Sequence, residues 1–251
     1  MNARFRSLEK HVVKPFTAFL EKASTQRALL NLRLNANKSS NKPLNDVARE
    51  NLSSLAVLET VASQVKACRK CKLWKTRKNA VPGMGSANAK IMFVGEAPGY
   101  WEDVKGEPFV GAAGKFLDTL LAEAGVSRRQ VFIGNVLKCR PPRNREPSPS
   151  EIMACISFLE RQIAAIKPKL IVTLGNHSSA CIFAKAGLKF NGITQARGKF
   201  YNANVLGLAV TVYPTFHPAA GLYSAKYKQL LVEDFRRLKT KISEMHLADS
   251  S

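Results

Sequence analysis

Acidic side chains are scarce in this sequence. Its 251 residues include 18 Asp and Glu against 39 Lys and Arg, which leaves a formal net charge of +21 at pH 7. Such an excess of positive charge predicts an anionic partner, because basic side chains release condensed counterions when they meet phosphates. Nucleic acid is the first candidate and an anionic membrane surface the second. The charge narrows the choice of partner but does not identify the chemistry.

Long apolar runs and abundant cysteines are also missing. No run approaches the roughly 18 apolar residues of a membrane span, and no secretory signal core is visible. Five cysteines in a chain of this length do not suggest a secreted disulfide scaffold. We therefore expect no membrane segment, and an intracellular compartment in which the cysteines are reduced thiols or metal ligands.

The length suits one medium-sized α/β domain with an appendage. The appendage lies at the N-terminus, where a polar stretch at 35–43 is typical of a linker between amphipathic helical segments near 8–33 and 44–66. An organellar targeting role, DNA binding and binding of a protein partner all remain open for it. We expect three regions along the chain: a basic N-terminal extension at 1–65, the main domain at 66–245 and a tail at 246–251.

A regular alternation of short apolar runs and helical patterns begins near residue 90. Each run has the length of a buried strand and is bounded by turn residues. Alternating strands and helices predict an α/β fold, with a parallel sheet covered by helices on both faces. Ligands in such folds bind beyond the carboxyl ends of the strands. The expected strands lie at 91–94, 131–133, 170–174 and 210–214, and the helices at 113–124, 149–166, 176–186 and 224–243.

Four of the cysteines have the spacing of a metal site. Cys68 and Cys71 form a CxxC pair, which lets two thiolates converge on one centre, and Cys139 and Cys155 complete a set of four. A redox dithiol is disfavoured, because the pair does not follow a strand-to-helix turn. Zinc and an iron–sulfur cluster both remain open on spacing alone. Cys181 lies within an apolar helical pattern, where we expect a packed thiol.

Unusual residues follow the expected strands. The Gly-Glu-Ala-Pro-Gly turn at 95–99 permits a sharp bend with free backbone N–H groups. Phe109, between proline and valine in a glycine-bounded loop, suits a rigid aromatic platform, and Asn135 offers a donor and an acceptor together. His217 could donate a hydrogen bond to a developing anion. Each signal is weak alone, because a core phenylalanine, a turn asparagine and a polar loop histidine are common.

Together these motifs resemble one family. The region from about Lys66 to Lys241 is similar to the family 4 uracil-DNA glycosylases, the iron–sulfur type found in bacteria and archaea. The resemblance covers roughly seventy per cent of the chain. It rests on the four cysteines, on Glu102-Asp103, and on GEAPG at 95–99, GEPFVG at 106–111, NVLKCRPP at 135–142 and HPAA at 217–220.

The resemblance implies the fold, the cofactor and the activity. The fold would be a three-layer α/β/α sandwich with a central four-stranded parallel sheet. A 4Fe-4S cluster would be held by Cys68, Cys71, Cys139 and Cys155, with zinc as the alternative. The activity would be hydrolysis of the N-glycosidic bond of uracil in DNA, which leaves an abasic site for base excision repair.

Roles for individual residues follow from the same resemblance. Uracil would stack on Phe109, Asn135 would read its O4/N3 edge, and the backbone at Glu96 and Ala97 would contact O2. His217 would stabilise negative charge on the departing base. We expect Glu102 to orient the attacking water or steady the sugar cation, with Glu96 as the alternative.

The expected DNA contacts lie mainly after the last strand. Leu222 or Tyr223 would enter the duplex, and Arg197 and Lys199 are candidates for contacting DNA. Tyr100-Trp101 departs from the acidic or small residues that many relatives carry after GEAPG. The stretch 143–148 lacks the histidine of relatives that become trapped on uracil, so we expect turnover.

The resemblance also sets the expected partner and compartment. The partner is uracil-containing DNA, single- or double-stranded, bound by a monomer in a DNA-containing compartment. The bacterial cytoplasm is the first choice and the mitochondrion the second. The alternative function is a nucleic-acid-binding protein that keeps the fold and the cluster but has lost catalysis. A glycosylase that also accepts deaminated purines is a third interpretation.

Overall fold

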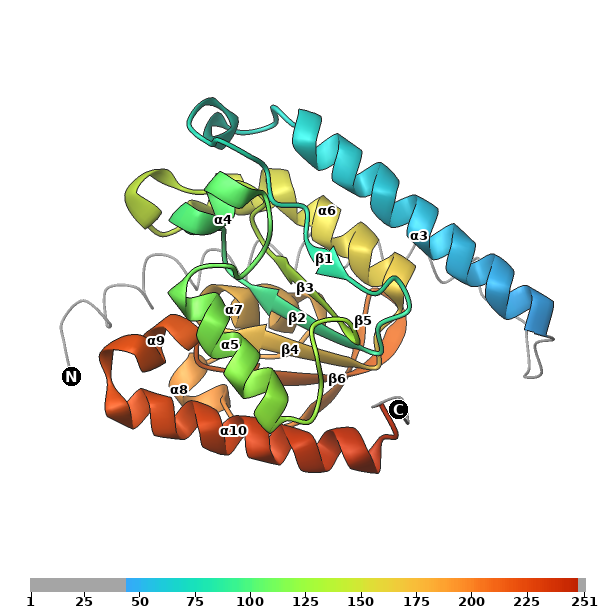
Figure 1. Cartoon of the computed structure of the whole chain (residues 1–251), viewed down its shortest axis with the longest axis vertical. Helices are drawn as coiled ribbons and strands as arrows, with labels where there is room; N and C mark the ends of the chain where they lie inside the picture. Colours follow the sequence, from blue (N-terminus) through green and yellow to red (C-terminus); the bar gives the residue numbers. More distant parts are fainter. Residues whose placement is uncertain (1–43, 248–251) are drawn as a thin grey trace.

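The computed structural model describes residues 44–247 of the chain, with side chains described from Leu52 onward. The helix expected near 8–33 therefore lies outside the described residues. A six-stranded sheet with strand order β1-β3-β2-β4-β6-β5 forms the centre of the molecule (Figure 1). Its strands are β1 (Met84–Gly85), β2 (Ile91–Gly95), β3 (Val131–Asn135), β4 (Leu170–Leu174), β5 (Tyr201–Val205) and β6 (Leu208–Thr215).

The four central strands confirm the expected parallel sheet. β3, β2, β4 and β6 run parallel to one another, and β2, β3 and β4 are buried along their whole length. Strands covered on both faces need such continuous apolar runs. The two edge strands, β1 and β5, pair antiparallel and were not expected from the sequence. β5 joins β6 through a tight turn in which Leu206 and Gly207 both have positive φ, at 56° and 86°.

The helices fall close to their expected positions. The Pro149–Ile166 helix matches its expected bounds because Ser148 and Glu151 form a reciprocal capping box at its start, with Pro149 in the first turn. The helices are α3 (Leu44–Ala67), α4 (Tyr100–Lys105), α5 (Ala112–Glu123), α6 (Pro149–Ile166), α7 (Asn176–Lys185), α8 (Ile193–Ala196), α9 (Pro218–Tyr223) and α10 (Ala225–Glu244), with short 3-10 turns at Lys72–Lys75 and Pro142–Asn144.

Helices cover both faces of the sheet, as expected. α5, α9 and α10 pack against one another on one face, where Phe93 of β2 stacks on Phe235 of α10 with ring centroids 6.1 Å apart. The connections β2–α5–β3 and β3–α6–β4 run in opposite directions along the sheet. Because such crossovers are right-handed, α5 and α6 lie on opposite faces. The fold is a three-layer α/β/α sandwich in which the four parallel strands gain an antiparallel strand at each edge.

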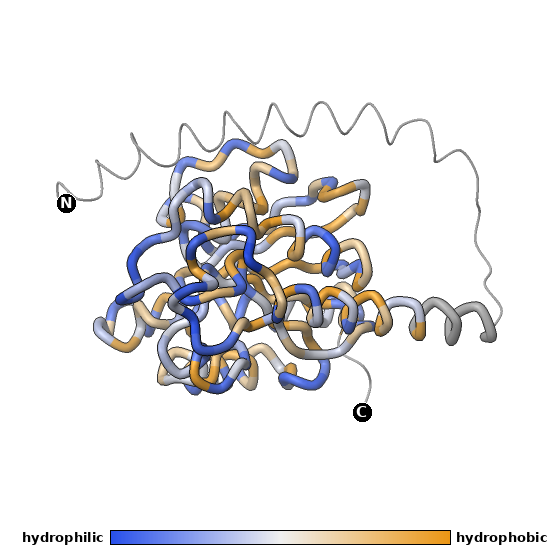
Figure 2. Tube along the Cα trace, turned by 90° about the horizontal axis from the view of Figure 1, so that it is seen from above, coloured by the Kyte–Doolittle hydropathy of each residue, from blue (hydrophilic) through white to orange (hydrophobic). Residues whose placement is uncertain are grey.

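Helix α3 packs against the domain from outside the sandwich. It runs along α6, where Ser54 Oγ donates a hydrogen bond to the carbonyl of Ala165 at 2.9 Å, and its Val61 and Val65 are fully buried. The boundary that we expected after residue 65 falls inside this helix. Figures 1 and 2 show α3 extending past the sheet and the other helices. Among residues 44–247, no helix is long and apolar enough to cross a membrane.

Candidate functional site

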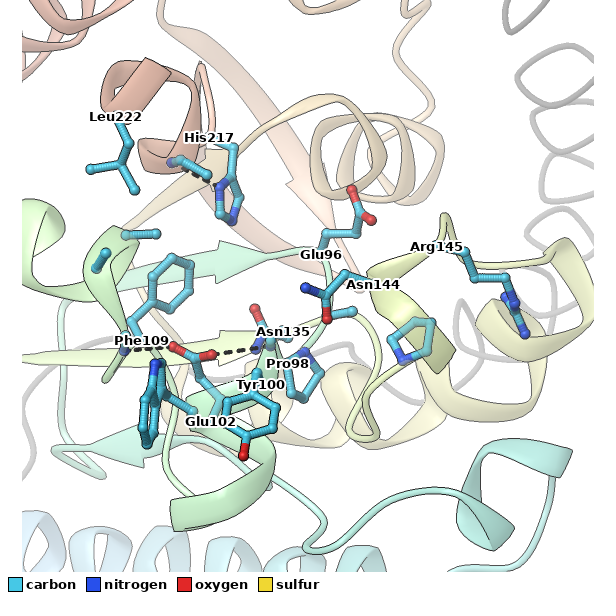
Figure 3. A pocket seen from close by; sticks show the side chains of 18 of the residues that line it. Glu96, Pro98, Tyr100, Glu102, Phe109, Asn135, Asn144, Arg145, His217 and Leu222 are labelled. Carbon is cyan, nitrogen blue, oxygen red and sulfur yellow. Dashed lines mark hydrogen bonds between the residues drawn. The ribbon is translucent and has the colours of Figure 1, made fainter. Parts of the chain in front are cut away.

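A pocket of about 460 Å³ opens at the carboxyl ends of the parallel strands (Figure 3). That volume lies within the range of small-molecule sites. Residues after β2, β3 and β6 meet there, as the sequence predicts for an α/β sheet. The residues expected to bind a base or take part in catalysis all line this pocket, namely Glu96, Ala97, Glu102, Phe109, Asn135 and His217.

Asn135 lies at the bottom of the pocket, at the end of β3. Its side chain is only 2% exposed, and Oδ1 is buried without a hydrogen-bond partner among the described residues. An unpaired buried carbonyl oxygen costs about 1–3 kcal/mol, and so such an atom indicates a missing ligand. The neighbouring Gly95 is required, because a Cβ there would collide with Asn135 Oδ1 and come within 2.8 Å of the Phe109 ring.

Phe109 forms one wall and has an unusual backbone conformation. Its φ is 54°, in the left-handed region that non-glycine residues rarely adopt. Arg128 stabilises this conformation by donating hydrogen bonds to the carbonyls of Pro108, at 3.1 Å, and Phe109. Gly114 is needed at the start of α5, because a Cβ there would overlap the Phe109 carbonyl. The strained turn points the ring into the pocket, a placement typical of functional sites.

Glu102 connects the two loops that flank the pocket. One carboxylate oxygen accepts hydrogen bonds from the backbone N–H groups of Val110 and Gly111, both at 2.9 Å, and the other accepts one from Gly99 at 3.1 Å. Three backbone donors therefore occupy the carboxylate that we expected to orient a water molecule. Glu102 lines the pocket, but its contacts are those of a residue that positions the loops.

His217 follows β6 and caps the first turn of α9. Its ring stacks beside Phe109, with centroids 5.6 Å apart and an angle of 26° between the planes. His217 Nδ1 accepts a hydrogen bond from the N–H of Ala219 at 3.2 Å, so the neutral ring carries its proton on Nε2. Burial lowers the pKa of His217 below its usual value, against the opposing charges of Glu96 and Glu102. The ring is therefore a neutral hydrogen-bond donor at neutral pH.

Glu96 is paired with a histidine that the sequence analysis did not identify. His177 Nδ1 lies 2.9 Å from Glu96 Oε2. Burial would raise the pKa of Glu96, but the hydrogen bond and charge of His177 outweigh it and hold this pKa below its usual value. Burial alone would lower the pKa of His177, but the hydrogen bond and charge of Glu96 outweigh burial and raise this pKa above its usual value. The pair keeps an ionised carboxylate at the pocket. His177 is the second residue of α7 and lies three residues after the end of β4, so its position near a strand end was the available signal.

The rim of the pocket carries exposed side chains. Leu222 and Tyr223 of α9 are 42% and 89% exposed and line the pocket, as we expected of DNA-contacting residues. Asn144 and Arg145 line it too, and Arg145 is oriented by two hydrogen bonds to Glu151.

The other two expected DNA contacts lie outside the pocket lining. Arg197 donates hydrogen bonds to both carboxylate oxygens of the buried Asp234, at 3.0 and 2.6 Å. Asp234 also accepts a bond from Thr215 at 2.6 Å. Arg197 therefore anchors the end of α8 to α10, and its guanidinium is engaged in these contacts inside the protein. Lys199 is exposed.

The four spaced cysteines lie close to one another. All are free thiols, with Cys139 and Cys155 buried and Cys68 and Cys71 half-buried. They lie close enough to influence one another's ionisation, and burial raises the pKa of Cys155 to about 12. Within the described part of the chain, no three such side chains are arranged to hold a single metal ion.

Two N–H groups point at these sulfur atoms. Arg77 donates a hydrogen bond to Cys139 Sγ at 3.0 Å, and the backbone N–H of Lys138 donates one to Cys155 Sγ at 3.3 Å. Arg77 also binds the carbonyl of Lys66 at the end of α3, at 2.6 Å. Such donors stabilise sulfur in its thiolate form, which is the form that ligates metals. Cys181 is a fully buried core thiol, as expected.

The geometry describes an α/β protein with a pocket at the carboxyl ends of its parallel strands, and comparison with known proteins identifies its class. A family model described as the uracil DNA glycosylase superfamily matches residues 82–239. This match spans more than half of the chain and includes β2 through most of α10. The chain belongs to this superfamily.

Known relatives narrow the class. A type-4 uracil-DNA glycosylase of Saccharolobus solfataricus is 52% identical over 187 residues, covering 74% of this chain and 87% of the relative. A type-4 uracil-DNA glycosylase of Sulfurisphaera tokodaii is 53% identical over 183 residues, covering 72% and 83%. That of Thermotoga maritima is 43% identical over 190 residues, covering 75% and 96%. Within the superfamily, the chain belongs to the type-4 uracil-DNA glycosylases.

The contacts of Glu102 predict a structural effect of its replacement. Glu102→Gln should lower the free energy of unfolding by about 1–3 kcal/mol, because the amide offers one acceptor oxygen and turns an NH2 group toward a backbone donor. Glu107→Gln is the matched control, since Glu107 is exposed in the loop between α4 and α5. This variant should change the free energy of unfolding by less than about 0.5 kcal/mol. Urea unfolding followed by circular dichroism measures both. Equal effects in the two variants would contradict the assigned contacts.

Proposed function

We propose that this protein hydrolyses the N-glycosidic bond of uracil in DNA and releases the base in base excision repair. The observation that carries the proposal is the unpaired Oδ1 of Asn135 at the bottom of a pocket walled by Phe109 and His217. Uracil presents an N3–H donor beside its O4 acceptor, which an asparagine amide matches with Oδ1 and Nδ2. Cytosine presents an acceptor at N3 and a donor at C4, which opposes the same amide. The pocket therefore selects uracil by its hydrogen-bonding edge.

The ring of Phe109 supports the base from one side. Its backbone conformation is held by Arg128, and Gly95 leaves room between it and Asn135. A flat ligand would stack on this ring while its edge meets the amide. The target base has to leave the DNA stack to reach this position, which costs a few kcal/mol and is least for an unpaired base.

His217 stabilises the departing base. Cleavage of the C1′–N1 bond passes through a sugar with oxocarbenium character and moves negative charge onto the uracil ring. The Nε2–H of neutral His217 donates a hydrogen bond to this developing anion at O2, while Nδ1 stays bound to Ala219. A donor that is already oriented costs no reorganisation at the moment of reaction.

Glu96 is better suited than Glu102 to act on the sugar and the water. Both carboxylates line the pocket, but Glu102 accepts three backbone hydrogen bonds whereas Glu96 is held by one histidine. The lowered pKa of Glu96 keeps it anionic, so it can steady the positive charge of the sugar and orient water toward C1′. His177 positions this carboxylate from outside the pocket lining.

The four cysteines fit a 4Fe-4S cluster. All four are free, they lie near one another, and N–H donors already point at Cys139 and Cys155. Four cysteine thiolates are the usual ligands of a 4Fe-4S cluster. When bound, the cluster supplies a covalent cross-link between the Cys68–Cys71 segment and the chain after Asn135.

The proposed substrate also determines the expected DNA contacts and the compartment. The basic chain binds DNA phosphates, Leu222 or Tyr223 fills the gap left by the extruded base, and the enzyme acts as a monomer on single- or double-stranded DNA. It works in an intracellular compartment that contains DNA, with the bacterial cytoplasm ahead of the mitochondrion. The basic N-terminal extension, expected at 1–65, binds DNA or a protein partner.

Base release from defined oligonucleotides tests the activity. Strands that carry one uracil, hypoxanthine, thymine or cytosine are incubated with the protein, treated with alkali and separated by gel. Uracil strands should be cleaved and thymine strands left intact. Asn135→Ala should lose most discrimination between uracil and cytosine, because the amide no longer opposes the cytosine edge. No release of any base would favour the DNA-binding protein without catalysis, and intact discrimination in Asn135→Ala would contradict the pocket assignment.

The pH dependence of single-turnover cleavage tests the role of His217. Because the pKa of His217 is lowered, the rate should be constant from pH 8 to about 6.5, the usual histidine value, and fall only below it. His217→Asn keeps an acceptor for Ala219 and an N–H donor but does not titrate. This variant should cleave more slowly than the natural protein. The loss should be smaller than the about 10²–10³-fold loss that follows when a hydrogen-bond donor is removed completely, and the rate should show no acid limb below about pH 6.5. The same acid limb in both proteins would exclude His217 as its origin.

Replacing one cysteine tests the cofactor. Cys155→Ser should lose most bound iron and the absorbance near 400 nm, and it should unfold at a lower temperature. Cys181→Ala is the control, because Cys181 is a buried residue of α7 and is not one of the four spaced cysteines. This variant should keep its iron. A colourless protein of natural sequence that contains stoichiometric zinc would contradict the cluster and indicate a zinc site.

A further inference from the structure

Two aromatic rings on the pocket rim have no part in the excision of uracil proposed above. Tyr100 and Trp101 begin α4, directly after the turn at 95–99, and both line the mouth of the pocket. They are 46% and 55% exposed, and their ring centroids lie 5.1 Å apart in an edge-to-face arrangement. In Figure 3, Tyr100 is drawn on one side of Asn135, and His217 and Leu222 are on the other. Exposed rings beside a binding pocket are typical of an interaction site.

Positive charge accompanies these rings. The guanidinium of Arg140 lies 5.1 Å from the centre of the Tyr100 ring, and Lys78 Nζ lies 5.7 Å from it. Arg140 comes from the segment after Asn135 and donates a hydrogen bond to Asn144 Oδ1 at 2.7 Å, so it is fixed beside the pocket. Both cations lie over the Tyr100 ring, where they suit the phosphate of a nucleotide whose base stacks on the neighbouring indole.

Backbone packing fixes the position of Trp101. A Cβ at Gly111 would lie 3.4 Å from Trp101 Cδ1, so the indole rests on the glycine that begins α5. Glu102 binds the N–H of the same glycine. The indole is therefore held by the loop that carries Phe109, and half of its surface stays open.

We propose that Tyr100 and Trp101 form a second base-binding subsite, in which the exposed indole of Trp101 stacks the unpaired nucleobase next to the extruded uracil and the cations over Tyr100 meet its phosphate. This inference rests on the proposed function and adds a contact to the neighbouring nucleotide. The occupant is a base and not an apolar peptide, because Arg140 and Lys78 suit the phosphate that accompanies it. Every base has an aromatic face, so the subsite accepts any sequence but requires a base that is free to leave its own stack. It therefore favours single-stranded or locally opened DNA.

The fluorescence of Trp101 reports on this subsite directly. The chain contains two tryptophans, Trp74 and Trp101. Trp74 also lies beside cations, Arg69 and Lys75, but it is not among the residues that line the pocket. In Trp74→Phe protein the signal comes from Trp101 alone and should be quenched by single-stranded DNA. In Trp101→Phe protein the remaining signal of Trp74 should change little. Quenching of Trp74 alone would overturn the proposal.

Equilibrium binding tests whether a neighbouring base is the occupant. The probe is a single strand with one 2′-fluoro-deoxyuridine, whose fluorine disfavours the sugar cation and prevents cleavage. A second probe is identical except that abasic spacers replace the bases on both sides. Trp101→Leu should bind the first probe about tenfold more weakly than the natural protein, as for loss of one stacked base. Both proteins should bind the second probe equally. Trp101→Phe should stay within about threefold of the natural protein on the first probe, because it keeps an aromatic face.

The outcomes separate the two proposals. Equal weakening of both probes by Trp101→Leu would mean that the indole only supports the pocket, and unchanged binding of both would remove the subsite. Trp74→Leu is the matched control and should affect the two probes alike. Failure to release uracil in the oligonucleotide assay contradicts the proposed activity but leaves these binding ratios measurable. Uracil release with no dependence on flanking bases contradicts the subsite alone.

Discussion

The carboxylate of Glu102 joins two loops that are separate in the sequence, and the shape of the pocket depends on it. Backbone N–H groups of Gly99, Val110 and Gly111 converge on its two oxygens. An ionised acceptor makes stronger hydrogen bonds than a neutral one, so the two loops are held at a fixed separation. Arg128 stabilises the second loop from the other side through the carbonyls of Pro108 and Phe109. The unfavourable φ of Phe109 persists because both sides of its turn are restrained.

Asn135 at the bottom of the pocket is connected to the four cysteines through a buried lysine. Lys138 Nζ donates hydrogen bonds to the carbonyl of Asn135, at 2.8 Å, and to Gln162 Oε1, at 2.7 Å, while its backbone N–H binds Cys155. Gln162 in turn donates to the carbonyl of Pro82. The segment between Asn135 and Cys139 is thus fixed to α6 at two points, Cys155 and Gln162. A cross-link at the cysteines would stabilise the site that selects the base without contacting it.

Much of this arrangement was predictable because strong local signals agreed with the global fold. Four continuous apolar runs predicted the parallel strands, and the capping box at Ser148 predicted α6. Asn135 and His217 were singled out from their positions after strands and Phe109 from its glycine-bounded loop, and the family resemblance supplied their expected roles. The edge strands were missed because β1 is two residues long and the alternation in β5 extends over only five residues, and because Leu206-Gly207 is not a common turn pair. The roles of Glu102, His177 and Arg197 depend on partners 8 to 81 residues away, which spacing alone does not reveal.

The buried ammonium of Lys138 has a consequence for the charge balance of the interior. Both oxygens that it binds are neutral, and its exposed fraction is 1%. Arg77 adds a second positive group beside Cys139. Buried charges are costly unless they are compensated, and a 4Fe-4S cluster on four thiolates carries net negative charge. The two cations would act as built-in counterions, so that filling the cysteine site also neutralises the core. Folding of the segment after β3 and acquisition of the cluster would then favour each other.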